Sequence, residues 1–191
     1  MFGYPLFLDL SGEQCLVFGG GEVALRKIQA LLKRGARVTC VSKDFCKSLK
    51  KLSHISPLVL PSPPQGGRGL KVRGGVPNGT LHLKRIHGNR MFLNGARIVI
   101  AATSNRDFNA RVAGACRKKK IWVNVVDDPE LCDFYVPAVV ERGPLQIAIS
   151  TGGASPLFAK RLREELEKVI PVSTGNLLER IGRIRKGTKK R

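Results

Sequence analysis

The stretch CLVFGGGEVALRKIQALLKRGARVTCV, Cys15 to Val41, decides the fold of this chain. It begins with a short apolar run, Cys15 to Phe18, which three consecutive glycines close. Apolar residues then recur near helical spacing as far as Leu32, and a second apolar run with β-branched residues follows at Arg37 to Val41. This order of patterns predicts a strand, a helix and a second strand, the βαβ unit of a parallel sheet.

The glycines after the first strand match the pattern G-x-G-x-x-G/A, as Gly19-x-Gly21-x-x-Ala24. In this pattern the first glycine permits a tight turn, the second lets the backbone approach a pyrophosphate, and the small third residue allows close packing of helix on strand. The helix N-terminus adds free N–H groups and partial positive charge. The turn therefore predicts a dinucleotide site, with a plain turn as the alternative. The expected cofactor contacts are Gly19, Gly20, Gly21, Glu22, Val23 and Ala24.

The residues after the second strand leave the choice of dinucleotide open. Val41 is followed by Ser42, Lys43 and Asp44, so no acid stands at the end of the strand itself. Asp44 follows Ala24 at the spacing of about 20 residues at which such sites carry the acid that bonds a ribose hydroxyl, whereas Lys43 can equally receive a 2′-phosphate. We expect NAD in preference to NADP, with Ser42 and Asp44 at the cofactor.

The chain beyond this unit continues the alternation of helices and strands. The pattern predicts helices at about 45–52 and 107–118, and strands at 81–86, 96–103 and 121–126. Further on it predicts two short strands, at 134–140 and 145–150, joined by residues 141–144. Two helices are predicted to follow, at 155–170 and 176–185. Residues 55–79 are rich in proline and glycine and are predicted to be a surface insertion. We expect an α/β fold whose N-terminal sheet is parallel.

Composition favours a globular protein. Of 191 residues, 42% are hydrophobic and 25% charged, and no apolar run is long enough to span a membrane. The apolar start carries Asp9 and no basic segment before it, so we expect no secretory signal and a cytoplasmic location. The five cysteines form no CxxC pair, which predicts reduced thiols and no cysteine metal site.

The net charge of +20 is concentrated in parts of the chain. No acidic residue occurs from Phe45 to Arg106 or from Arg180 to Arg191, and the run Arg117 to Lys120 is entirely basic. Such stretches attract polyanions, so nucleic acid and a polycarboxylate both qualify as partners, with solvated loops and a frayed tail as the alternative. No aromatic-rich basic motif is present, which makes nucleic acid the less favoured partner.

Four motifs in this order resemble the precorrin-2 dehydrogenase family, the dehydrogenase and chelatase part of siroheme synthase. They are YPLFLDLSGEQCLVFGGGEVALRK, VIAATSNRDFN, VNVVDDPELCDFYVPA and ISTGGASPLFAKRLREELE. The resemblance implies a homodimer with a Rossmann domain (1–133), a dimerisation segment (134–154) and a C-terminal helical segment with a basic tail (155–191). It implies NAD-dependent oxidation of precorrin-2 to sirohydrochlorin and, in bifunctional members, insertion of ferrous iron as a substrate to give siroheme.

The same resemblance places the functional aspartate of the family, through the letters NVVD, on Asp127. A carboxylate that follows a parallel strand lies at the sheet edge where such folds bind ligands, and it can accept the proton that a dehydrogenation releases. An Asp-Asp-Pro turn is the alternative, and Asp128 is a weaker candidate for the same role. Thr103 and Ser104 are expected to line the cofactor. Asn124 is expected near the substrate, unless it only caps a strand end.

A second glycine-rich turn precedes the first of the C-terminal helices, and the family places it at the substrate. Its residues are Ser150, Thr151, Gly152 and Gly153. A tetrapyrrole rich in carboxylates would meet the N–H groups of this turn and neighbouring basic side chains. An ordinary capped helix start is the alternative. No resident metal site is expected.

Two other functions compete with this one. Another NAD(P)-dependent oxidoreductase would share only the first βαβ unit. A nucleotide-sensing or nucleic-acid-binding protein without enzymatic activity would explain the basic stretches.

Overall fold

A computed structural model describes residues 3–54, 79–85 and 91–188 of the chain. Contacts divide these residues into two units. The larger holds 8–54, 79–85 and 91–135, and the smaller holds 3–7 and 136–188. The expected insertion, 55–79, lies outside the described residues except for Gly79. No helix among the described residues is long and apolar enough to cross a membrane.

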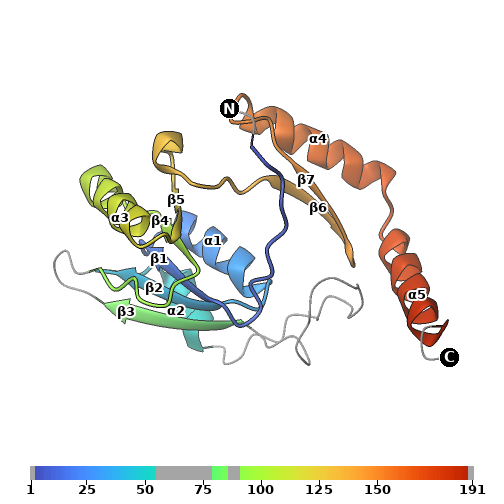
Figure 1. The fold of residues 1–191 in the computed structure, drawn as a ribbon, viewed down its shortest axis with the longest axis horizontal. Coiled ribbons are helices and arrows are strands. Elements are labelled where there is room, and N and C mark those ends of the chain that lie inside the picture. Colours follow the sequence, from blue (N-terminus) through green and yellow to red (C-terminus); the bar gives the residue numbers. More distant parts are fainter. Residues whose placement is uncertain (1–2, 55–78, 86–90, 189–191) are drawn as a thin grey trace. The chain divides into compact units, whose positions relative to one another are not determined.

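The larger unit is a parallel sheet with helices, as predicted (Figure 1). Its elements are β1 (Gln14–Phe18), α1 (Glu22–Leu32), β2 (Arg37–Ser42), α2 (Lys47–His54), β3 (Thr80–Arg85), β4 (Ile98–Ala101), α3 (Arg106–Lys118), β5 (Trp122–Val125) and a short 3-10 helix, η1 (Pro129–Leu131). The strand order is β3-β2-β1-β4-β5, and every neighbouring pair is parallel. The predicted α/β fold is confirmed.

Apolar cores form on both faces of this sheet, because helices pack on both and successive side chains of a strand point to opposite sides. In β1, Cys15 and Val17 pack with the buried face of α1, while Leu16 and Phe18 pack with α3. Phe18 meets Phe108 of α3 edge to face, with ring centroids 5.7 Å apart. Full burial of such a side chain contributes roughly 1.5–3 kcal/mol, so these two layers account for much of the stability of the unit.

The strand order reverses direction between β1 and β4, where the chain passes from one face of the sheet to the other. The carboxyl ends of the two strands are joined by backbone bonds: the N–H of Ala102 donates to the carbonyl of Phe18 at 2.7 Å. On the other side of β1, the N–H of Gly19 donates to the carbonyl of Val41 at 2.9 Å. In open α/β sheets such a reversal forms the crevice that binds ligands.

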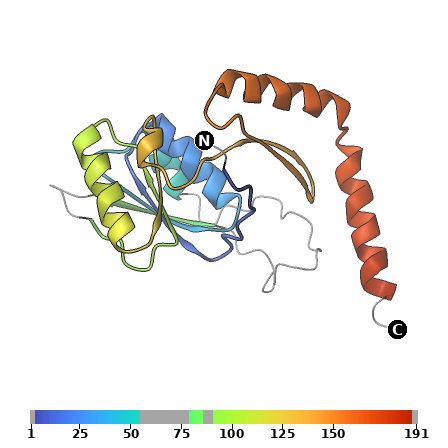
Figure 2. The ribbon, with the colours of Figure 1, turned by 45° about the horizontal axis from the view of Figure 1, so that its top comes forward.

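The smaller unit combines a hairpin with two helices (Figure 2). Strands β6 (Ala138–Arg142) and β7 (Leu145–Ile149) are antiparallel and are followed by α4 (Pro156–Val169) and α5 (Ser173–Thr188). Ser155 caps α4, since its Oγ accepts from the N–H of Phe158 at 3.1 Å, and Pro156 occupies the first turn. The Arg142 guanidinium donates to the carbonyls of Ile170 at 2.8 Å and Glu167 at 2.7 Å, and so ties the hairpin to the end of α4.

Element boundaries in the smaller unit differ from the predicted ones. Strand β6 begins at Ala138, not at 134, because Phe134 packs on the core of the larger unit. Glu141 and Arg142, expected in the connection, are paired strand residues, and the loop contains only Gly143 and Pro144. Gly143 has φ +58°, a conformation that two-residue hairpin loops use and glycine adopts without strain. Helix α5 also begins earlier than expected, at Ser173.

Candidate functional site

The first two glycines of the turn after β1 are required by the protein's own packing. Gly19 has φ +120°, and a Cβ atom there would overlap the carbonyl oxygen of Ala102, the residue after β4. A Cβ atom at Gly20 would overlap the carbonyl oxygen of Asp44 and lie 2.8 Å from Ser42 Oγ. The turn is therefore wedged between the ends of β2 and β4.

Gly21 differs from its two neighbours. A Cβ atom at Gly21 would meet no atom of the described residues within 4 Å. Gly21 is also the N-cap of α1 and has no side chain that could cap the first N–H groups of the helix. The helix N-terminus thus faces space that an anion can occupy, as a pyrophosphate site requires. Glu22 and Val23 begin the helix there, and buried Ala24 allows the close packing that the motif predicts.

The segment after β2 is held against the glycine turn. The N–H of Cys46 donates to the carbonyl of Gly20 at 2.8 Å, and Cys40 Sγ donates to the carbonyl of Gly19 at 3.2 Å. These bonds place Ser42 and Asp44 beside the turn, where the sequence predicted a cofactor contact.

The Asp44 carboxylate has a partner that sequence reasoning missed. Arg85, the last residue of β3, places Nη2 3.6 Å from Asp44 Oδ1. The parallel register of β2 and β3 causes this, because it pairs Ser42 with Arg85. Pairing of strands that are distant in sequence leaves no local signal. The sequence predicted the strand at 81–86, which contains Arg85, but not its contact with Asp44.

The loop after β4 carries Thr103 and Ser104, which were predicted to line the cofactor. Thr103 Oγ1 donates to Asn109 Oδ1 at 2.6 Å, and Asn109 Nδ2 donates back to the Thr103 carbonyl at 2.9 Å. Asn105 caps α3, since its Oδ1 accepts from the N–H of Phe108 at 2.8 Å. Ser104 is exposed at the tip of this loop. The buried Asn109 therefore fixes the loop, a role that its place within a helix pattern did not reveal.

Asp127 and Asp128 follow β5 and have different surroundings. Asp127 is exposed and has φ +61°, a left-handed conformation that is uncommon outside glycine, asparagine and aspartate. Asp128 is largely buried, and its Oδ2 accepts from Arg106 Nε, in the first turn of α3, at 3.2 Å. Of the two carboxylates predicted at this edge, Asp127 is therefore the more accessible to a ligand.

Cys132 holds the turn that contains Asp127. Its Sγ accepts from the N–H of Val125 at 3.1 Å, and its single S–H proton can be donated to the carbonyl of Val125 at 3.1 Å or of Asp128 at 3.3 Å. Burial raises the pKa of this thiol, which keeps it protonated near neutral pH. Asn124, predicted near the substrate, is buried in β5 and donates through Nδ2 to the Phe134 carbonyl at 2.9 Å. Its role at a substrate stays a prediction.

Lys27 of α1 is another residue that the sequence did not indicate. Burial lowers its pKa, as does the charge of Arg26, while Cys132 and Asp127 act in the opposite direction. Lys27 therefore belongs to the electrostatic surroundings of Asp127.

The turn from Ser150 to Gly153 lies in the smaller unit. Ser150 Oγ accepts from the N–H of Gly152 at 3.2 Å, and Thr151 Oγ1 accepts from the N–H of Ser155 at 3.0 Å. Gly152 and Gly153 have φ +62° and +89°, and a Cβ atom at Gly153 would meet no described atom within 4 Å. Two hydroxyls thus shape a glycine turn ahead of α4, while its exposed glycines leave room beside the backbone.

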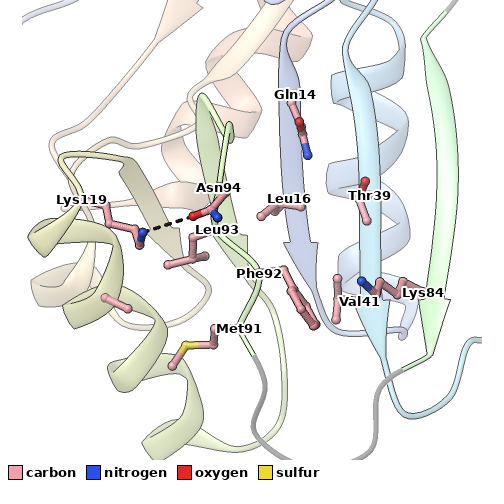
Figure 3. Close-up of a pocket in the computed structure, with 11 residues that line it drawn as sticks. Gln14, Leu16, Thr39, Val41, Lys84, Met91, Phe92, Leu93, Asn94 and Lys119 are labelled. Carbon is pink, nitrogen blue, oxygen red and sulfur yellow. Dashed lines mark hydrogen bonds between the residues drawn. The ribbon is translucent and has the colours of Figure 1, made fainter.

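A separate cavity of about 610 Å³ opens on the face of the sheet that α3 covers (Figure 3). It is lined by Gln14, Leu16, Thr39, Val41, Lys84, Met91, Phe92, Leu93, Asn94, Ala115 and Lys119. Both of its lysines have partners: Lys84 Nζ lies 3.8 Å from the Phe92 ring centroid, and Lys119 Nζ donates to Asn94 Oδ1 at 3.2 Å. None of the predicted site residues lines this cavity.

Comparisons with known proteins agree with the geometry of the glycine turn. A family model described as putative NAD(P)-binding matches residues 6–138, and one described as sirohaem biosynthesis protein central matches residues 142–168. Siroheme synthase of Vesicomyosocius okutanii is 35% identical over 189 residues, which are 97% of this chain and 35% of that protein. Siroheme synthase of Thioalkalivibrio sulfidiphilus is 40% identical over 174 residues, 91% of this chain and 31% of that protein.

The chain thus spans about a third of the length of these curated relatives. A solved structure of SirC, a precorrin-2 dehydrogenase, is 28% identical with a TM-score of 0.64. That similarity covers 91% of this chain and 74% of the SirC chain.

Proposed function

The chain belongs to the putative NAD(P)-binding family and is related to siroheme synthases and to a precorrin-2 dehydrogenase, and on this premise we propose that it oxidises precorrin-2 to sirohydrochlorin with NAD. One observation carries the proposal. The sheet that presents the open glycine turn at Gly21 also carries the exposed carboxylate of Asp127 after β5. Such a sheet can hold a dinucleotide and a proton acceptor along the same carboxyl edge.

The residues at the turn fit a dinucleotide. Gly19 and Gly20 hold the turn in place, and Gly21 leaves the α1 N-terminus open to a pyrophosphate. Ser42 and Asp44 would meet the ribose next to the adenine, and Thr103 and Ser104 would line the other side. When bound, NAD supplies the acceptor for the hydride that the substrate loses.

Asp127 would accept the proton that leaves with this oxidation. Its carboxylate is exposed, in contrast to that of Asp128, and Lys27 of α1 lies in its electrostatic surroundings. A carboxylate within reach of the substrate is a suitable general base.

The turn from Ser150 to Gly153 would bind the substrate. The macrocycle carries carboxylates, for which N–H groups in a glycine turn and basic side chains are suitable partners. The smaller unit supplies such cations on the exposed side chains of Lys160, Arg161, Arg180, Arg183 and Arg185. Binding of this polyanion accounts for part of the basic excess without a nucleic acid.

The active form would be a homodimer, in which 134–154 form the dimerisation segment and 155–191 the helical segment. The smaller unit exposes large apolar side chains, including Leu157, Phe158, Val169 and Val172. Exposed apolar residues grouped on one unit are typical of an interface between chains. We place this dimer in the cytoplasm, which agrees with five cysteines that are all unpaired with one another.

Sirohydrochlorin ferrochelatase activity is the second part of the proposal, with ferrous iron as substrate. The described residues contain no group of three or more His, Cys, Asp or Glu side chains that could hold a metal ion. The nitrogens of the bound macrocycle would therefore capture the iron, with Asp127 removing pyrrole protons.

The direct test is an anaerobic assay with precorrin-2 and NAD, in which the absorbance of NADH and of sirohydrochlorin is followed together. We expect both products to form in equal amounts, because each oxidation delivers one hydride. A protein that binds NAD but leaves precorrin-2 unchanged would contradict the proposed substrate. Gel filtration and light scattering of the same sample test the dimer.

A further inference from the structure

The ion pair of Asp44 and Arg85 stands at the ends of two neighbouring strands. The register of β2 and β3 pairs Ser42 with Arg85, which brings the guanidinium beside the segment that follows β2. Nη2 of Arg85 lies 3.6 Å from Oδ1 of Asp44. The Arg85 side chain is 59% exposed and the Asp44 side chain 88%. A pair this exposed is weak, so a ligand can take either group from the other.

This pair lies beside the glycine turn. The carbonyl of Asp44 abuts Gly20, and the N–H of Cys46 donates to the Gly20 carbonyl at 2.8 Å. In a βαβ nucleotide unit, the groups after the second strand meet the ribose hydroxyls of the adenosine half. Asp44 and Arg85 are therefore positioned at the only part of the cofactor in which NAD and NADP differ.

The charges at this position favour neither cofactor strongly. A lone acid accepts the ribose 2′-hydroxyl of NAD and repels the 2′-phosphate of NADP, whereas an arginine accommodates that phosphate. Here Asp44 follows the exposed Lys43 in sequence and is paired with the exposed Arg85. Planar guanidinium groups bind phosphate through two N–H donors, so Arg85 is better suited than Lys43 to this task.

We propose that Arg85 is a specificity-determining residue of the dinucleotide site, and that through it the chain binds NADP with an affinity comparable to that for NAD. The inference rests on the proposed function, since it needs a dinucleotide at the glycine turn. In the NAD complex the Asp44 carboxylate accepts a hydrogen bond from the ribose hydroxyl, and Arg85 stays paired with Asp44. In the NADP complex the Arg85 guanidinium turns from Asp44 to the 2′-phosphate.

Direct binding measurements test this without any turnover. The dissociation constants of NADH and NADPH are measured by the fluorescence of the reduced nicotinamide, on the full chain and its variants. For the unmodified chain we expect the two constants to lie within about tenfold of each other. Arg85→Ala should weaken NADPH by about tenfold and leave NADH unchanged or tighter, because one charge-assisted phosphate contact is lost. Arg85→Lys keeps the charge and should recover part of the NADPH affinity.

Arg97→Ala is the matched control. Arg97 immediately precedes β4, at the opposite end of the strands from Arg85, and its guanidinium lies 5.9 Å from the Trp122 ring centroid. Its removal should change neither constant.

Three results would overturn the inference. NADH binding more than about 100-fold tighter than NADPH binding, or equal weakening of both ligands in Arg85→Ala, would remove the role of Arg85 and leave the dinucleotide site intact. Failure of the unmodified chain to bind either ligand would overturn the dinucleotide site and with it the proposed function.

Discussion

Gly19 and Ala102 touch across the point where the strand order reverses, so closely that a Cβ atom on Gly19 would overlap the carbonyl oxygen of Ala102. Gly19 also has φ +120°, a backbone conformation that residues with a side chain rarely adopt. We therefore expect Gly19→Ala to lower the free energy of unfolding by about 2–6 kcal/mol, the sum of backbone strain and overpacking. Urea denaturation measures this. Stability equal to that of the unmodified chain would show that the turn can move away from β4.

Gly21 should behave differently, because a side chain there points into open space. We expect Gly21→Val to keep the fold and to abolish cofactor binding, since the branched side chain fills the space that a pyrophosphate needs. Calorimetric titration with NAD checks binding, and circular dichroism checks the fold. Unchanged NAD affinity in a folded variant would remove the assignment of this turn to the cofactor.

The turn and its two strands show how much the sequence could predict. The βαβ unit and the five parallel strands follow from apolar periodicity and glycine placement, which are local properties. Arg85 and Asn109 were missed because their roles depend on the register of β3 beside β2 and on a side chain that reaches back from α3 to Thr103. Contacts between elements far apart in sequence leave no periodic signal. The predicted strand at 134–140 ended too early for a similar reason. Glu141 and Arg142 have the composition of a loop, and only their partners on β7 show that they belong to the strand.

Asn109 offers a prediction about such a contact. Its amide exchanges two hydrogen bonds with Thr103, and it is 4% exposed. We expect Asn109→Ala to lower the free energy of unfolding by about 1–3 kcal/mol, because the Thr103 hydroxyl and carbonyl both lose a partner. NAD affinity should fall as well, since the Thr103 loop loses its support. Asn94→Ala, which removes only an exposed hydrogen bond from Lys119, is the control; it should lower stability less and leave NAD affinity unchanged.

The buried thiols predict how stability depends on alkaline pH. Burial raises the pKa of Cys15 and of Cys40 to about 12, from 9.0 for an ordinary thiol. The folded chain thus keeps protons that the unfolded chain loses above pH 9.0. The contribution of these two thiols to the free energy of unfolding is therefore complete below that pH and is lost as the pH rises to about 12. The free energy of unfolding should fall through this window, and less steeply in the double variant Cys15→Ala, Cys40→Ala. Equal slopes for both proteins would contradict the assignment.

Asp127 provides the last prediction, which concerns the two reactions proposed for this site. Its φ of +61° makes asparagine the suitable replacement, because asparagine tolerates the left-handed conformation and alanine does not. Asp127→Asn therefore removes the charge and keeps the turn. We expect it to lower NADH formation from precorrin-2 by about 10²- to 10⁴-fold, the usual contribution of a general base, and to leave NAD affinity unchanged.

The same variant should lose siroheme formation from supplied sirohydrochlorin and ferrous iron, because one carboxylate is proposed to remove protons in both reactions. Asp128→Asn is the matched control. Because this carboxylate is paired with Arg106, its loss should lower the free energy of unfolding and have little effect on either rate. If Asp127→Asn keeps both rates, Asp127 is only a turn residue. If the unmodified chain makes no siroheme, its activity ends at sirohydrochlorin, and iron insertion requires a different protein.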